Sequence, residues 1–295
     1  MMTSFIIRAC AKVNLTLEVL DRRPDGYHNL ESVTICIGLW DRLEFEVSDG
    51  PAEIAVSVEG EGAPEGEENT VYRAAASFLA ATGRELKIRA RIAKGIPAQA
   101  GLGGGSSDAA AALRALNGMT GSPLDAEDLQ AMGAEIGSDV PLFMIGGTVL
   151  MRGRGEIVTP LPDVPRFWLV LAKPDYGVST AAAYAALDKA ADRTRRHRAE
   201  AASAAIHAGN LREIAGCLWN DFEVPVFQMR PDIRGLKERL LEIGALGALL
   251  AGSGSAVFGI FDAPTLAESA RERLQSEGGA AWLAPSLTRE ESLAL

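Results

Sequence analysis

The sequence predicts a protein that mixes helices and strands and folds in two domains. Segments in which apolar and polar residues alternate, as in half-buried strands, are interspersed with alanine-rich segments that place apolar residues at helical spacing. A cluster of glycine and proline between residues 153 and 165 interrupts the chain near its middle. The 295 residues suffice for one large or two medium domains. We therefore predict one domain at residues 1–157 and a second at residues 158–295.

The first domain is expected to begin with strands and to continue with helices. Alternation predicts strands over residues 12–19, 32–39, 41–47, 53–58 and 86–92. The acidic, glycine-rich stretch 59–69 is expected to be an exposed loop. Helical spacing predicts three helices. They cover residues 71–82, then a segment near Asp108 that is capped by Ser106 or Ser107, then residues 126–136 behind the capping candidate Asp125.

The second domain is expected to open with a buried strand at residues 167–172, which are almost all apolar. Several helices follow between residues 180 and 241. Two short strands, 248–251 and 256–261, flank a second glycine cluster, and a last helix and strand close the chain. The basic run 193–198 is expected to be a solvated helix end or loop.

Composition excludes several classes of protein. The net charge of −10 argues against nucleic acid or an acidic membrane as the main partner. No apolar run reaches the roughly 18 residues of a membrane-spanning helix, and the N-terminus lacks the pattern of a signal peptide. The three cysteines are far apart, which predicts reduced thiols in a cytoplasmic protein, and the three histidines are scattered, so no structural zinc site is expected.

The glycine- and serine-rich run 101–107 is the strongest chemical signal. It lies between a predicted strand and a predicted helix, where glycine lets the backbone approach a ligand and the first helical amides bind phosphate. A Walker A loop is excluded because no lysine precedes the final serine, and the dinucleotide pattern is excluded because Ser106 stands where a third glycine is required. A flexible glycine turn without a ligand remains the alternative at this point.

The segment from Pro97 to Leu113 resembles the second motif of the GHMP kinases. Three further stretches resemble family segments: residues 11–30, residues 137–141 and residues 250–258. Gln99 departs from the pattern, since the family usually has glycine there. The resemblance implies an α/β fold of two domains, the first like the second domain of ribosomal protein S5 and the second ferredoxin-like, with the active site between them. It also implies ATP as phosphoryl donor, together with Mg²⁺.

The resemblance assigns catalytic roles to Asp139 and Lys12. Asp139 is expected to accept the proton of the substrate hydroxyl, although its local sequence is equally typical of a helix N-cap. Lys12 is expected beside it, where its charge would orient the carboxylate and offset charge on the transferring group. In an alternating strand, however, most lysines are simply exposed. Asn14 shares the face of Lys12 and is expected to bind substrate or phosphate.

The resemblance also implies two sets of binding residues. The ATP side is expected to comprise Asn69, Lys94, Pro97, Gly101, Leu102, Gly103, Gly104, Gly105, Ser106 and Ser107, with Ser106 or Ser107 reaching the metal ion and with plain exposure an alternative for Lys94. The substrate side is expected to comprise Asn14, Tyr27, His28, Ser179, Thr180, Tyr184, Gly252, Ser253 and Gly254.

Gly26-Tyr27-His28 is the most discriminating piece of the resemblance. By itself it follows a predicted turn and could be a surface turn with a half-buried tyrosine. The resemblance assigns it to a small-molecule substrate, a cytidine diphosphate-linked methylerythritol, with Tyr27 and Tyr184 on the faces of the base and His28 at its polar edge. Other kinases of the family, of mevalonate or homoserine type, and a non-catalytic nucleotide-binding module remain alternatives. The sequence leaves a monomer and a homodimer open.

Overall fold

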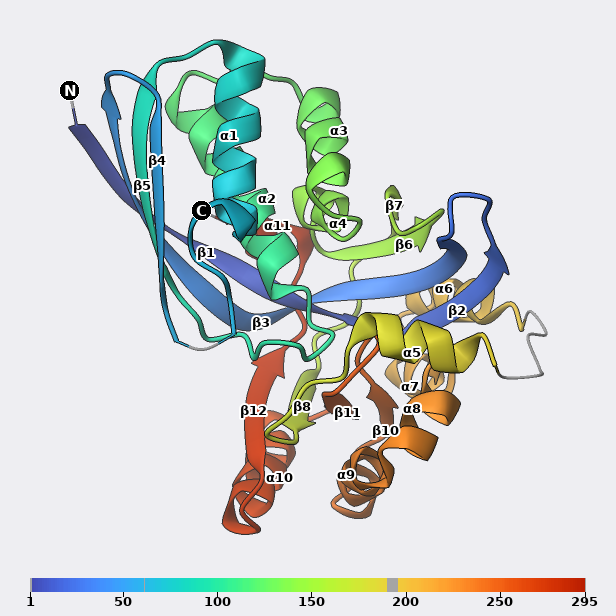
Figure 1. Cartoon of the computed structure of the whole chain (residues 1–295). Helices are drawn as coiled ribbons and strands as arrows, with labels where there is room; N and C mark the ends of the chain where they lie inside the picture. Colours follow the sequence, from blue (N-terminus) through green and yellow to red (C-terminus); the bar gives the residue numbers. More distant parts are fainter. Residues whose placement is uncertain (1, 61, 190–195, 295) are drawn as a thin grey trace.

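The computed structural model describes residues 2–60, 62–189 and 196–294, and it contains two sheets with helices packed on both (Figure 1). An eight-stranded sheet belongs mainly to the first half of the chain, and a four-stranded sheet belongs to the second half. The predicted mixture of helices and strands is confirmed. The chain passes from one sheet to the other between residues 160 and 168. Among the described residues, no helix combines the length and apolar character needed to cross a lipid bilayer.

Two long strands cross the middle of the molecule and carry the large sheet. β1 (Met2–Asn14) and β3 (His28–Asp49) run antiparallel along almost their whole length, with one irregularity between Cys10 and Ala11. The separate strands predicted at 32–39 and 41–47 are therefore one strand, because pairing with β1 continues past the break in alternation. The other strands of this sheet are β2 (Thr16–Arg22), β4 (Glu53–Glu59), β5 (Leu86–Ala93), β6 (Thr148–Arg152), β7 (Ile157–Pro160) and β9 (Trp219–Asn220).

The helices of the first half gather on one face of this sheet (Figure 1). In β5 every second side chain is buried, so that one face meets the helices while the other meets solvent. The prediction for residues 126–136 is confirmed, with Asp125 forming a capping box with Asp128. The elements are η1 (Gly66–Glu68), α1 (Thr70–Thr82), α2 (Gly104–Met119), α3 (Ala126–Ile136) and α4 (Val140–Ile145).

The start of α2 differs from the prediction. The helix begins at Gly104 behind Gly103, whose φ of 74° is in the left-handed region, and no side chain caps it. Ser106 and Ser107 therefore lie inside the first turns and are not caps. The glycine run itself supplies the backbone conformation that a capping serine would otherwise support. As a result, the free amides at the start of α2 belong to the glycine run.

The second sheet is antiparallel in the order β10-β11-β8-β12. With α9 before β10 and α10 before β12, it follows the β-α-β-β-α-β succession of a ferredoxin-like unit, as the resemblance implied. The elements of this half are β8 (Trp168–Lys173), α5 (Thr180–Leu187), α6 (Arg198–His207), α7 (Leu211–Gly216), α8 (Glu223–Met229), α9 (Pro231–Glu242), β10 (Gly247–Leu250), β11 (Val257–Phe261), α10 (Pro264–Ser276), β12 (Ala280–Pro285) and α11 (Arg289–Leu293).

The two halves share one apolar core at the end of β1. Ala11 and Val13 are fully buried and belong to the same cluster as Phe167 and Phe258 of the second half. Lys12 and Asn14, which alternate with them along the strand, are buried as well. β9 also joins the halves, since it pairs in parallel with β2 of the large sheet. The division of the chain at residue 157 stays a prediction.

The basic run 193–198 is only partly described, because residues 193–195 lie outside the described residues. The guanidinium groups of Arg196 and Arg198 lie 4.8 and 4.7 Å from the ring centroid of Trp219. Their backbone amides donate hydrogen bonds to the buried carboxylate of Glu18, at 2.6 and 2.7 Å. The solvated interpretation agrees with the exposure of Arg196 and with the start of helix α6 at Arg198, while the aromatic ring and the buried carboxylate hold the segment against the molecule.

Candidate active site

The glycine run packs directly against the second glycine cluster. Gly101 has a φ of 76°, and a Cβ placed on it would lie 2.0 Å from the carbonyl oxygen of Ala251. A Cβ on Gly103 would lie 3.0 Å from Cγ of Lys12 and from the ring of Phe143. The Lys12 amide donates to the carbonyl of Leu102 at 3.0 Å. These glycines are therefore fixed by close backbone approach on several sides, and the run is an ordered turn.

A cavity of about 420 Å³ opens beside this turn. All the residues predicted for the ATP side line it except Ser107, namely Asn69, Lys94, Pro97, Gly101, Leu102, Gly103, Gly104, Gly105 and Ser106. The side chain of Ser107 is buried on another face of α2, where it lines a separate small cavity with Cys10 and Arg114. A Cβ on Gly137 would lie 3.6 Å from the hydroxyl of Ser106. Of the two serines, Ser106 thus lies toward the segment that carries Asp139.

Asn69 lines the cavity but uses its side chain locally. Its amide oxygen accepts from the Val71 amide at 2.8 Å and caps α1, while its amide nitrogen donates to the Pro64 carbonyl at 2.7 Å. These two bonds fix the loop that forms one wall of the cavity. Asn69 therefore shapes the predicted nucleotide site through the backbone that it holds.

Lys94 is buried between two carboxylates, so the alternative of plain exposure is wrong. Its ammonium forms ion pairs with Asp41 and, at 2.8 Å, with Asp108, and all three side chains are almost completely inaccessible. The other oxygen of Asp41 accepts from the amides of Gly95 and Ile96 at 2.7 and 2.8 Å. The cluster ties the end of β5 to the first turns of α2. Lys94 thus holds the walls of the cavity together.

The Lys94 cluster has one more negative than positive charge. Burial raises the pKa of Asp108 to about 7. The Lys94 ammonium opposes this rise and the Asp41 carboxylate adds to it. Burial alone would lower the pKa of Lys94, but the carboxylates of Asp108 and Asp41 outweigh it and leave that pKa raised. Asp108 is therefore the member of the cluster whose charge changes near neutral pH.

We expect the contribution of Asp108 to the free energy of unfolding to decrease as pH rises from about 4 toward 7, because its carboxyl group binds a proton more tightly in the folded than in the unfolded protein. One such group contributes at most about 1.4 kcal/mol per pH unit. Asp108→Asn removes this contribution, so the variant should gain stability relative to the parent protein between pH 5 and pH 8. Urea unfolding at both pH values measures the difference. Parallel pH curves for the two proteins would contradict the assignment.

A second cavity, of about 680 Å³, lies on the other side of the glycine run, and Gly101 and Gly103 line both cavities. Most residues predicted for the substrate side and for catalysis line it: Lys12, Asn14, Tyr27, His28, Asp139, Thr180, Tyr184, Gly252 and Ser253. Two predicted residues do not line it. Ser179 caps α5 through its hydroxyl, and Gly254 faces the side chains of Leu250 and Val178.

Lys12 and Asp139 meet in this second cavity. The Lys12 ammonium lies 3.4 Å from a carboxylate oxygen of Asp139 and donates to the amide oxygen of Asn14 at 2.8 Å. Asn14 in turn donates to the hydroxyls of Ser32 and Thr34 at 2.8 and 3.0 Å. Lys12 is buried, unlike most strand lysines, while Asp139 is one third exposed. A buried network thus fixes the lysine, and the carboxylate faces the cavity.

Asp139 stands at the N-cap position of α4, but its side chain makes no capping hydrogen bond. The N-cap interpretation is therefore correct for its position in the chain and wrong for its side chain. Pro141 follows within the first turn and has no amide proton that would need a cap. The carboxylate remains available for a reaction in the cavity.

Aromatic rings form one wall of the cavity. The rings of His28 and Tyr184 stack with centroids 5.2 Å apart, and Tyr184 meets the edge of Phe222 at 4.8 Å. Burial, with the charges of Asp139 and Asp188, raises the pKa of Tyr184 to about 12. The side chain of Tyr27 is more than half exposed, and the guanidinium of Arg154 lies 5.0 Å from its ring centroid.

Three charged residues that line the cavity were not predicted from the sequence, namely Arg22, Arg154 and Asp188. Arg154 stands between Gly153 and Gly155 in a turn after β6, and this Gly-Arg-Gly pattern was a usable signal. Asp188 follows Tyr184 by four residues at the end of α5, which places both on one helix face. That spacing could have been recognised only once Tyr184 was known to face the cavity.

Gln99, the residue that departs from the family pattern, adopts a φ of 51° that glycine tolerates better. Its carbonyl accepts a hydrogen bond from the amide of Ser255 at 3.1 Å. Its side chain covers Gly177 so closely that a Cβ there would lie 2.2 Å from Oε1 of Gln99. Gln99 thus joins the glycine run to the second half of the chain through both its backbone and its side chain.

We expect Gly177→Ala to lower the free energy of unfolding by about 1–3 kcal/mol, because the added methyl group overlaps the Gln99 side chain. In a Gln99→Gly background the same change should cost less than about 0.5 kcal/mol, since the clash is gone. Urea unfolding of the two single variants and the double variant measures this coupling. Additive effects would mean that the two residues do not touch in solution.

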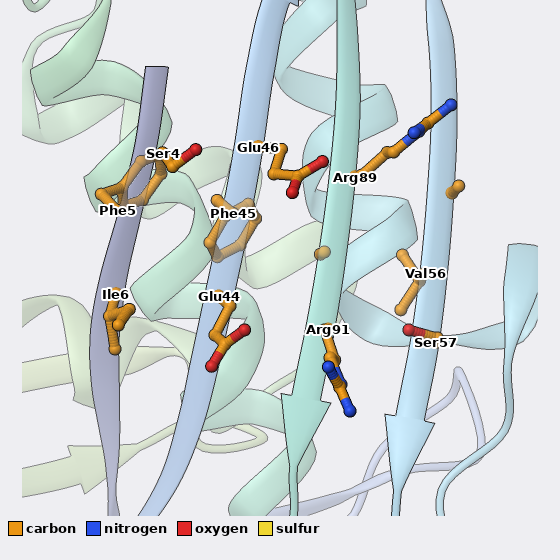
Figure 2. A pocket seen from close by; sticks show the side chains of 12 residues that line it. Ser4, Phe5, Ile6, Glu44, Phe45, Glu46, Val56, Ser57, Arg89 and Arg91 are labelled. Carbon is orange, nitrogen blue, oxygen red and sulfur yellow. The ribbon is translucent and has the colours of Figure 1, made fainter. Parts of the chain in front are cut away.

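A hollow of about 550 Å³ lies elsewhere, on the face of the large sheet opposite the helices (Figure 2). Figure 2 shows Glu44 and Glu46 of β3 beside Arg91 and Arg89 of β5, which the strand register places opposite one another. Arg91 is also paired with Glu59, and Glu44 with Arg42. The charged side chains thus lie in rows of opposite sign on regular strands, and neither glycine turn reaches this hollow.

Comparison with known proteins identifies the family. The profile of the "GHMP kinases N terminal domain" matches residues 69–147, and that of "GHMP kinases C terminal" matches residues 199–280. The 4-diphosphocytidyl-2-C-methyl-D-erythritol kinase of Pelotomaculum thermopropionicum is 48% identical over 252 residues, covering 85% of this chain and 87% of the relative. The chain belongs to the GHMP kinases. The enzyme of the same name from Desulfitobacterium hafniense is 41% identical over 282 residues, which cover 95% of this chain and 95% of the relative.

Solved structures agree with this assignment of the GHMP kinase fold. A crystal structure of 4-(cytidine 5'-diphospho)-2C-methyl-D-erythritol kinase has a TM-score of 0.79 and 35% identity, covering 96% of this chain and 99% of the other. The L. major mevalonate kinase, solved in complex with R-mevalonate, has a TM-score of 0.76 at 17% identity, and the match covers 97% of each chain. At that identity the likeness shows the fold alone. The fold does not separate the branches of the GHMP kinases.

Proposed function

We propose that this kinase transfers the γ-phosphoryl group of ATP to the 2-hydroxyl of 4-diphosphocytidyl-2-C-methyl-D-erythritol, giving the 2-phosphate and ADP. The reaction belongs to the non-mevalonate route to isoprenoid precursors. The observation that carries the proposal is that two cavities share Gly101 and Gly103, and that Lys12 and Asp139 meet in the larger of these two cavities. Relatives with this printed name, 40–48% identical over most of the chain, support the choice of substrate.

The cavity of about 420 Å³ is proposed to hold the phosphates of ATP. The amides that open α2 face outward at the positive end of the helix dipole, which favours anions. The 680 Å³ cavity is proposed to hold the cytidine diphosphate-linked alcohol, with its base near Tyr27, His28 and Tyr184. Because both cavities are lined by Gly101 and Gly103, the terminal phosphate and the acceptor hydroxyl would meet at this turn.

In the proposed reaction the substrate oxygen forms a bond to the γ-phosphorus, and the bond from that phosphorus to the bridging oxygen of ADP breaks. Asp139 accepts the proton of the attacking hydroxyl. ADP leaves with the electron pair of the broken bond. Lys12 lies 3.4 Å from Asp139 and stabilises both the carboxylate and the negative charge of the transferring group. Phosphoryl transfer depends mainly on position and charge compensation, and these residues supply both.

Mg²⁺ fits the residues present at the junction. The described residues contain no group of three or more His, Cys, Asp or Glu side chains that could hold a metal by themselves. Mg²⁺ usually takes one or two protein oxygens, with phosphate and water completing its shell. Ser106, which lines the proposed phosphate cavity, is the proposed protein oxygen. When bound, the ion would neutralise charge on the phosphates.

The substrate assignment is tested by ADP release with a panel of alcohols, comprising the cytidyl diphosphate substrate, R-mevalonate and L-homoserine. We expect turnover with the cytidyl compound alone. Turnover with mevalonate or homoserine, and none with the cytidyl compound, would replace the proposed substrate. ATP binding with no turnover of any of the three would favour a non-catalytic nucleotide-binding module.

A further inference from the structure

The side chain of His28 contacts a carboxylate inside the substrate cavity. Its Nε2 lies 2.9 Å from Oδ1 of Asp188, and only 4% of its side chain is exposed. The separation is that of a hydrogen bond, but the carboxylate lies off the direction of the ring N–H, so Nε2 has no aligned partner among the described residues. A small rotation of either side chain would align the pair. The ring face of His28 is fixed by its stack on Tyr184.

Asp188 is held in place by the helix that carries Tyr184. It stands at the end of α5, its amide donates to the carbonyl of Tyr184 at 2.8 Å, and its carboxylate lines the cavity. Helix geometry therefore fixes the position of the carboxylate relative to the ring of Tyr184, on which His28 stacks. One short helix thus controls both the plane of the imidazole and the environment of its Nε2.

A carboxylate beside Nε2 determines what Nδ1 can do. An ionised carboxylate only accepts hydrogen bonds, so it favours the imidazole form that carries its proton on Nε2. In that neutral form Nδ1 is an acceptor and must face a donor. The bases differ at this point, since cytosine presents an exocyclic amino group where uracil presents a carbonyl oxygen. An acceptor at Nδ1 would attract the amino group and repel the carbonyl.

We propose that Asp188 is a positioning residue that fixes the tautomer of His28 and thereby makes the cavity select a base with an exocyclic amino group over one with a carbonyl. The inference rests on the proposed function, because it assumes that the base of the substrate lies against His28. It adds to that function the residue that discriminates cytosine from uracil. Asp188 acts through His28 and does not itself contact the reacting atoms.

The kinetic test compares the cytidine substrate with its uridine counterpart. A buried acceptor such as Nδ1 that faces the carbonyl oxygen of uracil makes no hydrogen bond, and the loss lowers kcat/KM by a large factor. The parent enzyme should therefore prefer the cytidine substrate by about 100-fold or more in kcat/KM. Asp188→Asn introduces an amide that can donate to Nε2 and move the ring proton to Nδ1. Its preference for cytidine should fall at least about tenfold through KM, with kcat for the cytidine substrate within about threefold of the parent enzyme.

Two further variants separate positioning from a general loss of structure or charge. Asp188→Glu keeps an accepting carboxylate and should restore most of the preference for cytidine. Asp262→Asn removes an exposed aspartate at the end of β11 and should leave both substrates unaffected. Equal use of the two substrates by the parent enzyme would overturn the proposal. So would an Asp188→Asn variant that loses activity toward both substrates in the same proportion.

The tautomer can be read without any substrate, from the imidazole ¹⁵N chemical shifts. The chain has only three histidines, so His28→Gln identifies the signal. We expect the proton of His28 on Nε2 in the parent protein and on Nδ1 in Asp188→Asn. A doubly protonated ring, or the same tautomer in both proteins, would overturn the proposal. If the parent enzyme uses neither nucleotide substrate but phosphorylates mevalonate, the proposed function fails while this measurement still tests the role of Asp188.

Discussion

Asp139→Asn is expected to lower kcat by about 10²–10⁴-fold, the usual contribution of a positioned general base. Asparagine has nearly the same shape but cannot accept the proton of the attacking hydroxyl. Because the Asp139 side chain makes no capping hydrogen bond, its replacement should leave the stability of α4 almost unchanged. Lys12 also keeps its hydrogen bond to Asn14. Single-turnover kinetics with ATP and the cytidyl substrate measure the chemical step.

The matched control for this prediction is Asp125→Asn. Asp125 is an exposed aspartate whose side chain caps α3, and asparagine caps helices equally well. We expect this variant to retain the kcat of the parent enzyme, and both variants to keep the KM for ATP within about threefold. If Asp139→Asn kept more than about a tenth of the parent kcat, Asp139 would be an orienting charge and not the base.

Gly101→Ala is expected to disrupt both stability and ATP binding. A methyl group there would lie 2.0 Å from the carbonyl oxygen and 2.7 Å from the carbonyl carbon of Ala251, and a φ of 76° disfavours alanine. Backbone cannot move aside as a flexible side chain can, so the two glycine clusters must separate. The overlap and the left-handed backbone together should cost roughly 2–5 kcal/mol of the free energy of unfolding. Thermal unfolding and ATP titration measure the two effects.

Gly118→Ala provides the control at a glycine with free space around it. Gly118 lies near the end of α2, where no atom comes within 4 Å of the added methyl group, and alanine stabilises a helix by about 0.5–1 kcal/mol relative to glycine. This variant should unfold at the same or a higher temperature than the parent protein. If Gly101→Ala were as stable as Gly118→Ala, the close packing of the two glycine clusters would not exist in solution.

Several features of the site could be predicted because they depend on neighbouring residues in the chain. The strand-to-helix glycine run, the helix at residues 126–136 and its cap at Asp125 all follow from backbone preferences that act over a few residues. The exact start of α2 could not be predicted in this way. Serine caps and positive-φ glycines compete for the same position, and close contacts at Gly101 and Gly103 decided the outcome.

The sequence could not show that Lys12 and Lys94 are buried, because the residues around each of them are also typical of an exposed lysine. Lys12 lies in an alternating strand, and its side chain is buried between the glycine run, Asn14 and Asp139. Lys94 is buried because Asp41 and Asp108 converge on it from β3 and α2. These partners are 53 and 14 residues away, at distances that no local pattern spans.

The sequence by itself determined a glycine run between a strand and a helix, for which phosphate binding is predicted, and the resemblance to the GHMP kinases, which assigns residues 26–28 to a nucleotide-linked substrate. Only the tertiary structure decided that Asp139 leaves its carboxylate uncapped, that Ser106 and not Ser107 lies toward it, and that Asp188 lies beside His28. The first set depends on the conformations and residue types of short segments. The second depends on which faces of distant elements meet when the two halves of the chain pack together.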